Sequence, residues 1–330
     1  MPTRKVDLFA RRDHFIDHLA PVWHALPEER RGVFYTNEQS RQYAHDKIGS
    51  RVVAITNIPN GQNPVLTCAY GDMNRASRSD RKLIMMEHGT GHGFKTPAYP
   101  DALGGQRDKV SLFLSPNEYT AKKTRAVRSA PVHVIGTPKI DFLLNISREN
   151  PGNGTVCISF HWGNKKTNPP ESGSALEYYL DYLPLYKKFY GARLVGHGHP
   201  LARDEHKRIF EKFGIEYLET FDEVCRRVSL YVSDISSTLY EFTAIGKPVI
   251  LLNAPWFRKD VHHGIRFWDY SDIGRNVDHP AELIGAIESV LANPSINMER
   301  RKKMIRDLYP FLGVSAEIAA NRITDFMDSL

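Results

Sequence analysis

The chain has 330 residues, of which 41% are hydrophobic and 25% are charged, and its formal net charge is +6. This length fits one large domain or, more commonly, two of roughly 150–170 residues each. The sequence contains no run of about 18 apolar residues that would span a membrane. Residues 1–14 lack a long apolar segment, which predicts no secretory signal. Cys68, Cys157 and Cys225 form no CxxC pair, so we expect a cytoplasmic protein without a thiolate metal site.

Positive charge is concentrated in the first half of the chain. Residues 1–148 carry 22 Lys and Arg against 14 Asp and Glu, a net charge of +8, and the remaining 22 basic and 24 acidic residues give −2. A solvated surface would account for this excess. A polyanionic partner would also account for it: a nucleic acid, a phosphate polymer or an anionic membrane surface contacted peripherally. The expected acceptor-binding patch consists of Arg75, Arg78, Arg81, Lys122, Lys123 and Arg125.

Short apolar runs alternate with helical stretches along the first half. Segments with strand character lie at 5–10, 32–36, 51–56, 64–70, 82–88, 110–116 and 132–136. The stretches 14–26 and 117–127 have the pattern of amphipathic helices. Near-continuous apolar strands that alternate with such helices predict a parallel sheet covered on both faces.

The second half repeats this alternation after residues 145–154, whose Asn, Gly and Pro content is typical of a linker. Strands are expected at 155–162, 192–198, 215–219, 230–234 and 247–253, and helices at 174–190, 201–214, 221–228 and 237–246. The sequence therefore predicts an α/β protein with two Rossmann-like, doubly wound domains that face a cleft, with ligands at the carboxyl ends of the strands. The expected divisions are 1–148, 149–300 and C-terminal helices at 301–330 that pack back across the domains.

In the first half, the motif EHGTGHGFK (87–95) follows a predicted strand and contains His88, Gly89, His92 and Lys95. The glycines lack the spacing of a dinucleotide fingerprint, but they would let a ligand approach the backbone closely. A histidine at such a strand end can act as a general base, or it can simply cap the turn. The motif IGTPKID (135–141) is typical of an architectural turn.

In the second half, SFHWGNKK (159–166) places Lys165, and GHGHP (196–200) places Gly198 and His199, after predicted strands where an anion could bind. Histidines from several turns could meet around a metal ion. However, no HExxH pattern or supporting carboxylate set accompanies them. We therefore expect no metal and no other cofactor.

The motif SDISST (233–238) joins a strand to the crossover helix of a βαβ unit. Such a helix start presents free N–H groups and the positive end of the helix dipole, to which Ser236, Ser237 and Thr238 add hydroxyl donors. One serine would suffice to cap the helix, so we expect a diphosphate to bind here. Asp234 has the wrong charge to contact phosphate and is expected to cap the helix or to orient a histidine or a ribose hydroxyl.

Taken in this order, EHGTGHGFK, IGTPKID, GHGHP and residues 232–253 resemble the CDP-glycerol:poly(glycerophosphate) glycerophosphotransferase family, over roughly residues 80–260. The resemblance implies the GT-B fold, a donor held by the C-terminal domain, and no dinucleotide or metal. It makes His88 the general base on the acceptor hydroxyl, His199 a contact of the donor diphosphate, and Ser236 and Ser237 phosphate ligands. The chain departs from the family pattern at Ile235, where a Tyr is usual, at Lys139, where an Arg is usual, and in the position of Lys95, which lies two residues further from His88.

These features predict a metal-independent transferase. It would move a glycosyl or glycerophosphate group from a CDP- or UDP-linked donor to a hydroxyl of a polyanionic acceptor. One alternative is a phage-type glycosyltransferase that modifies hydroxymethylated DNA bases. A second is a sugar-nucleotide epimerase, which would need no acceptor. A non-catalytic nucleic-acid binder would leave the histidine turns and the serine cluster unexplained.

Overall fold

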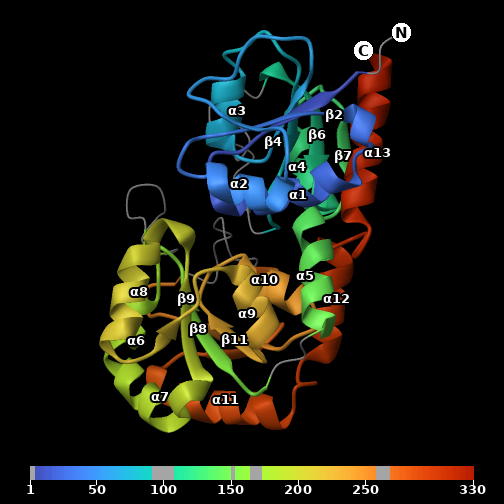
Figure 1. Ribbon diagram of the computed structural model, residues 1–330. Helices are drawn as coiled ribbons and strands as arrows, with labels where there is room; N and C mark the ends of the chain where they lie inside the picture. The colour runs from blue at the N-terminus through green and yellow to red at the C-terminus, as the bar shows by residue number, and fades with distance from the viewer. Residues whose placement is uncertain (1–3, 91–107, 150–152, 164–172, 258–267) are drawn as a thin grey trace. The chain divides into compact units, whose positions relative to one another are not determined.

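The computed structural model describes residues 4–90, 108–149, 153–163, 173–257 and 268–330, which form two compact units (Figure 1). The first unit contains the described residues up to 90, together with 108–142 and 307–330. The second contains the described residues from 143 to 306. The chain leaves the first unit within helix α5 (Pro138–Glu149) and returns to it at the end of helix α12 (Met298–Leu308). None of the described helices is long and apolar enough to cross a membrane.

The first unit is built on a parallel sheet of seven strands in the order β3-β2-β1-β4-β5-β6-β7. They are β1 (Val6–Phe9), β2 (Arg31–Thr36), β3 (Val52–Ala54), β4 (Val65–Thr67), β5 (Leu83–Met86), β6 (Val110–Ser115) and β7 (Val132–Val134). Each of the seven strands predicted for the first half is confirmed. The strand order reverses its direction between β1 and β4, and ligands of open parallel sheets bind at such a switch point.

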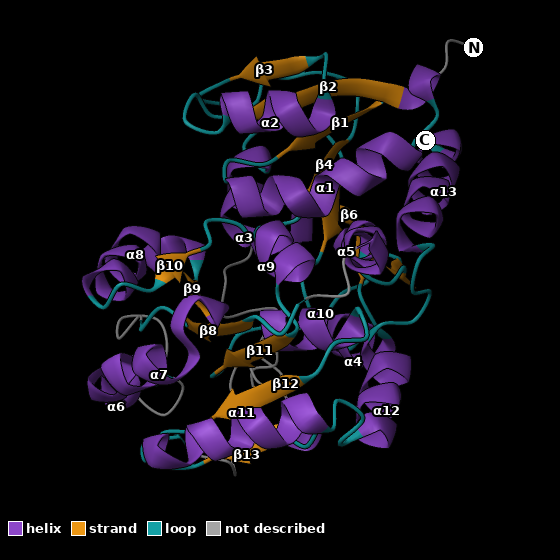
Figure 2. Ribbon diagram, turned by 60° about the horizontal axis from the view of Figure 1, so that its bottom comes forward, coloured by secondary structure: helices purple, strands orange, loops and turns teal. Residues whose placement is uncertain are grey.

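Helices cover both faces of this sheet, as the apolar strands require. They are α1 (Asp13–Ala25), α2 (Arg41–Ile48), α3 (Tyr70–Ala76), α4 (Glu118–Arg125) and α13 (Ser315–Ser329). Helices α1 and α2 lie side by side (Figure 2), and both share with α13 one apolar cluster that also contains Ile84 and Met86 of β5. The alternate residues Leu83 and Met85 face α3 on the opposite side. The period-2 alternation of side chains thus buries both faces of one strand.

The second unit has a parallel sheet of six strands in the order β10-β9-β8-β11-β12-β13. They are β8 (Val156–Phe160), β9 (Leu194–Gly198), β10 (Glu216–Tyr217), β11 (Leu230–Ser233), β12 (Val249–Leu252) and β13 (Arg275–Val277). The five predicted strands are confirmed. Strand β13 has no apolar run because only one of its three side chains is buried, so the sequence gave no signal for it.

The helices of the second unit are α6 (Leu176–Tyr179), α7 (Leu183–Tyr190), α8 (Arg203–Lys212), α9 (Phe221–Arg227), α10 (Thr238–Ala244) and α11 (Leu283–Ala292). The single helix expected at 174–190 was wrong. A 3-10 turn interrupts it, and Pro184 lies in the first turn of α7, where its missing N–H is tolerated. The linker expected at 145–154 was also wrong for residues 145–149, which continue α5.

The IGTPKID motif supports the start of α13 inside the first unit. Gly136 has φ +80°, and a Cβ there would stand 2.5 Å from the Pro310 carbonyl oxygen. The Asp141 carboxylate accepts hydrogen bonds from the backbone N–H groups of Gly313 and Ala316, both at 2.8 Å. The motif therefore has the architectural role expected from the sequence.

Candidate active site

Three adjacent strands of the second unit, β9, β8 and β11, end in polar motifs. His199 follows β9, while His161 and Trp162 follow β8. The His199 ring stacks on Trp162, with centroids 5.5 Å apart and an interplanar angle of 17°, and it meets the His161 ring edge-on at 5.0 Å. The sequence analysis did not single out His161 and Trp162. The signal that could have found them was their position directly after a buried strand, which they share with His199.

Asp234 is fully buried and joins these motifs through the backbone. Its carboxylate accepts hydrogen bonds from the N–H groups of His161 (2.9 Å), Ala175 (2.9 Å) and Ile235 (2.8 Å). Burial raises the pKa of Asp234, and these three donors oppose the rise. Asp234 therefore fixes the turn after β11 to the turn after β8, and it positions a histidine through the main chain.

The hydroxyls of SDISST are partly used inside the turn. Ser236 Oγ accepts hydrogen bonds from the N–H and the hydroxyl of Thr238, at 3.3 and 2.7 Å. The Thr238 hydroxyl also pairs with the Tyr231 hydroxyl at 2.8 Å. The half-buried side chain of Ser237, at the N-cap of α10, makes no capping hydrogen bond. The hydroxyls of Ser236 and Thr238 are thus hydrogen-bonded to each other within the turn, whereas the Ser237 hydroxyl makes no capping hydrogen bond.

Packing requires a residue without a side chain at Gly198. A Cβ at this position would stand 1.9 Å from Nδ1 of His206, and a Cβ at Gly196 would stand 2.4 Å from the ring of Phe210. His206 and Phe210 lie one turn apart on α8 and are both buried. The two glycines therefore let α8 pack closely on β9, while a phosphate contact of the Gly198 backbone stays a prediction.

We expect Gly198→Ala to lower the free energy of unfolding by about 1–3 kcal/mol, because the added methyl group must displace His206 from a filled core. Urea denaturation monitored by circular dichroism measures the change. Gly285→Ala is the matched control. A Cβ at Gly285 meets nothing within 4 Å, and its position inside α11 predicts a gain of up to about 1 kcal/mol. An unchanged midpoint for Gly198→Ala would contradict the close packing of α8 on β9.

The hydrogen bonds of His199 determine where its proton lies. Its Nδ1 accepts a hydrogen bond from the Leu201 N–H at 3.1 Å. Because an accepting ring nitrogen carries no proton, the neutral imidazole has its N–H on Nε2. His199 is thus set up as a hydrogen-bond donor, which is the role that a phosphate oxygen requires.

His88, at the end of β5 in the first unit, has the opposite arrangement. Its Nδ1 lies 2.5 Å from the carbonyl oxygen of Cys68, which can only accept, so Nδ1 carries the proton and Nε2 is the basic nitrogen. The rings of Phe15 and His18 pack against it at 4.8 and 5.6 Å. The pKa of His88 is lowered to about 4, chiefly by burial and to a smaller extent by the positive charge of Lys139, while the hydrogen bond to the Cys68 carbonyl opposes the shift. The imidazole is therefore neutral at pH 7 and can accept a proton.

The glycine after His88 permits the turn, because Gly89 has φ +67°. His92, Lys95 and Lys165 were also expected at the site, but they lie outside the described residues.

The predicted basic patch needs one correction. Arg81 is buried and forms an ion pair with the buried Asp7, and its Nε donates to the Asn63 carbonyl oxygen at 2.7 Å. It therefore stabilises the core of the first unit and does not face an acceptor. The remaining members have exposed or half-buried side chains on or next to α3 and α4: Arg75, Arg78, Lys122, Lys123 and Arg125.

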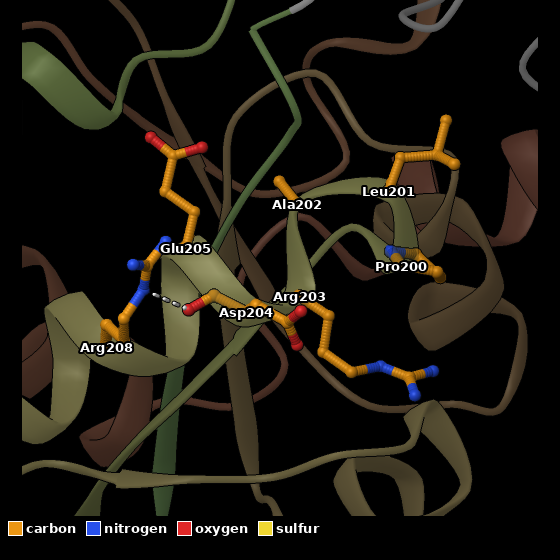
Figure 3. A pocket seen from close by; sticks show the side chains of 7 residues that line it. All are labelled: Pro200, Leu201, Ala202, Arg203, Asp204, Glu205 and Arg208. Atoms are coloured by element: carbon orange, nitrogen blue, oxygen red, sulfur yellow. Dashed lines mark hydrogen bonds between the residues drawn. The ribbon is translucent and has the colours of Figure 1, made fainter.

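A hollow of about 440 Å³ lies over the first turn of α8, directly after His199 in the chain. Its lining residues are Pro200, Leu201, Ala202, Arg203, Asp204, Glu205 and Arg208 (Figure 3). The Arg208 Nε donates to the Asp204 carbonyl oxygen at 3.1 Å, and the Arg203 side chain extends away from Arg208. The positive charges of its two guanidinium groups cancel the negative charges of its two carboxylates. The hollow therefore has no net positive charge to attract a diphosphate. Within the described part of the chain, no three His, Cys, Asp or Glu side chains are placed to hold a metal ion.

Neither a family model nor a curated protein matches this sequence. Solved structures do match it over nearly its whole length. A protein assigned as a UDP-N-acetylglucosamine 2-epimerase from Listeria monocytogenes has a TM-score of 0.64 at 13% identity, covering 99% of this chain and 97% of its own. The S. aureus MnaA–UDP structure has a TM-score of 0.63 at 12% identity, covering 99% and 98%.

A variant of the wall teichoic acid polymerase TagF with CDPG has a TM-score of 0.63 at 12% identity, covering 100% of this chain and 89% of its own. The chain has the GT-B fold. The two Rossmann-like α/β domains predicted from the sequence are thereby confirmed. At 12–13% identity these similarities establish the fold and leave the reaction open.

Proposed function

We propose that this chain is a GT-B transferase that binds a nucleotide-diphosphate donor at the carboxyl ends of β8, β9 and β11. The observation that carries the proposal is the convergence of His199, Trp162 and the Ser236–Ser237 turn on three adjacent strand ends. Ligands of parallel sheets bind at this edge. Two GT-B neighbours hold UDP and CDPG, respectively, which supports a donor of this class.

In this proposal, neutral donors hold the diphosphate. The His199 Nε2–H and the Ser237 hydroxyl donate to its oxygens. His161 beside them stays uncharged, because burial lowers its pKa well below the usual value. Fixed dipoles of this kind stabilise the negative charge that develops on a leaving group without reorganising during the reaction.

His88 acts on the acceptor hydroxyl in this mechanism. Its Nε2 takes the proton, the hydroxyl oxygen forms the new bond to the transferred group, and the bond to the leaving nucleotide breaks with its electron pair on the nucleotide. A histidine already neutral at pH 7 needs no prior deprotonation for this step. The transferred group is glycosyl or glycerophosphate, as the sequence resemblance implies.

A sugar-nucleotide epimerase is the second candidate function. The similarity to the two epimerase-type structures covers 99% of this chain, and the similarity to TagF covers 100%. An epimerase would convert its nucleotide-sugar without an acceptor, whereas a transferase would leave the donor intact until an acceptor is added. Glycosylation of hydroxymethylated DNA stays a prediction from the basic first half.

A thermal-shift panel with UDP, CDP, GDP, ADP and CDP-glycerol tests the donor site, with NAD as the control. Ligand at about 100 times its Kd adds roughly 2.7 kcal/mol of stability, which raises the Tm by a few degrees. We expect a response to one or two of these nucleotides, and Ser237→Ala should reduce it whereas Ser329→Ala, on the last helix, should not. The responding donor is then incubated alone, with glycerol phosphate polymer, and with hydroxymethylated or plain duplex DNA. No response to any nucleotide would reject the donor site, and conversion without acceptor would identify an epimerase.

A further inference from the structure

The turn that carries His88 is held by a residue near the C-terminal end of the chain. Thr90, the second residue after His88, has its hydroxyl oxygen 3.0 Å from the hydroxyl oxygen of Tyr309. Thr90 and Tyr309 are 1% and 2% exposed, and both belong to the first unit although 219 residues separate them in sequence. Because burying a polar group is costly unless it is hydrogen-bonded, this pairing fixes the Thr90 side chain to Tyr309.

Tyr309 is itself held in a defined position. It directly follows α12, at the point where the chain returns to the first unit. The Leu308 carbonyl oxygen accepts a hydrogen bond at 3.2 Å from the side-chain amide of Asn117, which is fully buried after β6. On the other side, the Pro310 carbonyl oxygen packs so closely on Gly136, after β7, that a Cβ there would stand 2.5 Å from it. The Tyr309 hydroxyl therefore projects from a backbone segment that the ends of two strands hold.

This hydrogen bond bears on His88 because only a glycine separates His88 from Thr90. Gly89 has φ +67°, and glycine restricts the backbone less than any other residue. Before the glycine, His88 is tied to the first unit by the hydrogen bond from its Nδ1 to the Cys68 carbonyl oxygen. After the glycine, Thr90 is tied to Tyr309. The chain is therefore fixed on both sides of its most permissive residue, which limits the directions in which the His88 ring can point.

We propose that Tyr309 is a positioning residue for His88, and that through Thr90 it keeps the basic Nε2 of the imidazole directed at the acceptor hydroxyl. This inference rests on the proposed role of His88 as the general base. A displacement of a reacting group by about 1 Å can lower a rate about a hundredfold, so the hydroxyl of a residue that never contacts substrate can affect turnover. The returning end of the chain thus supports the candidate base as well as the core.

Tyr309→Phe tests the proposal, because it removes the hydroxyl and keeps the ring. We expect kcat with the responding donor and its acceptor to fall about tenfold, as loss of one hydrogen bond predicts, while KM stays within about twofold. Tyr186→Phe is the matched control, since the Tyr186 hydroxyl is also buried and donates to the Pro280 carbonyl oxygen at 2.7 Å in the second unit. The control should lose similar stability and keep full turnover. An unchanged kcat in Tyr309→Phe overturns the proposal.

A second measurement does not depend on turnover. In protein labelled with ¹⁵N in the histidine rings, NMR shows which ring nitrogen of His88 carries the proton, and His88→Gln assigns the signals. Wild type should carry it on Nδ1, as the bond to the Cys68 carbonyl oxygen requires. We expect Tyr309→Phe to populate the other tautomer as well, whereas Thr90→Ser, which keeps the hydroxyl, should retain the wild-type spectrum. A wild-type His88 spectrum in Tyr309→Phe would show that Tyr309 only packs. If wild type turns over no donor but Tyr309→Phe changes the tautomer, the transferase function fails while the coupling of Tyr309 to His88 stands.

A double variant separates positioning from folding. Thr90→Val alone leaves the buried Tyr309 hydroxyl without the Thr90 hydroxyl, whereas Thr90→Val combined with Tyr309→Phe removes both groups and should recover part of the lost Tm. We expect kcat of the double variant to stay about tenfold below wild type, because the hydrogen bond is still missing. Recovery of kcat together with the Tm would show a purely structural role and overturn the proposal.

Discussion

Arg81→Ala is expected to lower the free energy of unfolding by about 3–5 kcal/mol, because it leaves the Asp7 carboxylate buried without a cation. The two side chains are only 2% and 4% exposed. The Asp7 carboxylate also accepts hydrogen bonds from the Val33 N–H at 2.8 Å and from the Asn63 amide at 3.2 Å, which hold it in place when the arginine is removed. Water therefore has little access to the Asp7 carboxylate once its positive partner has been removed.

Urea denaturation at pH 7 measures this loss. Arg78→Ala is the matched control, since Arg78 is exposed in the same basic segment and should change the stability by no more than about 0.5 kcal/mol. A loss below about 1 kcal/mol for Arg81→Ala would mean that the ion pair is solvated. Arg81 would then count again as a surface residue that can bind an acceptor.

The second large effect is on turnover. His88→Gln should reduce the rate with the responding donor by about 10²–10⁴, because the acceptor hydroxyl loses the group that takes its proton. Donor affinity should stay within twofold, since the contacts proposed for the donor's phosphates belong to the second unit. Single-turnover kinetics and nucleotide titration measure the two quantities. His133→Gln, a half-buried histidine on β7, is the control. Full turnover in His88→Gln would show that His88 is not the general base.

The pH dependence of the wild-type rate gives an independent test of His88. Burial lowers its pKa to about 4, so the proton-accepting form predominates at all pH values above that. As the pH falls through about 4 the base is protonated and kcat/KM should fall with it, while between pH 5 and 7 His88 should cause no decline. A decline centred near 6.5 would point to a histidine with an ordinary pKa.

The strands were predictable because each is an apolar run bounded by turn residues, and twelve of them form where expected. Strand β13 was missed because its exposed Arg275 and Asn276 interrupt any such run. The end of α5 was missed for a different reason. The composition of residues 145–154 is typical of a linker, yet Ile146 is buried and extends the helix into it.

The strand ends that carry the candidate residues were predictable, whereas their role as a site stays a prediction. Strand ends identified His88 in the first unit, and His199 and the SDISST turn in the second, because parallel strands place such turns at one edge of each sheet. The burial of Arg81 depends on Asp7, which is 74 residues away in sequence. The Arg11 side chain, which follows β1, pairs with Asp72, which is 61 residues away. Neither partner can be found from local composition, and the tautomers of the two histidines depend on backbone groups that a sequence does not position.

Helix α13 has a consequence for the order in which the molecule folds. Ile323 and Met327 of this helix are fully buried in the core of the first unit, and Arg4 donates a hydrogen bond to the Met327 carbonyl oxygen at 3.0 Å. The second unit is one continuous stretch in its described core strands and is complete by residue 306. Synthesis proceeds from the N-terminus, and domains fold as units. The second unit can therefore fold on the ribosome before the first unit is complete, because the first unit still lacks α13 at that point.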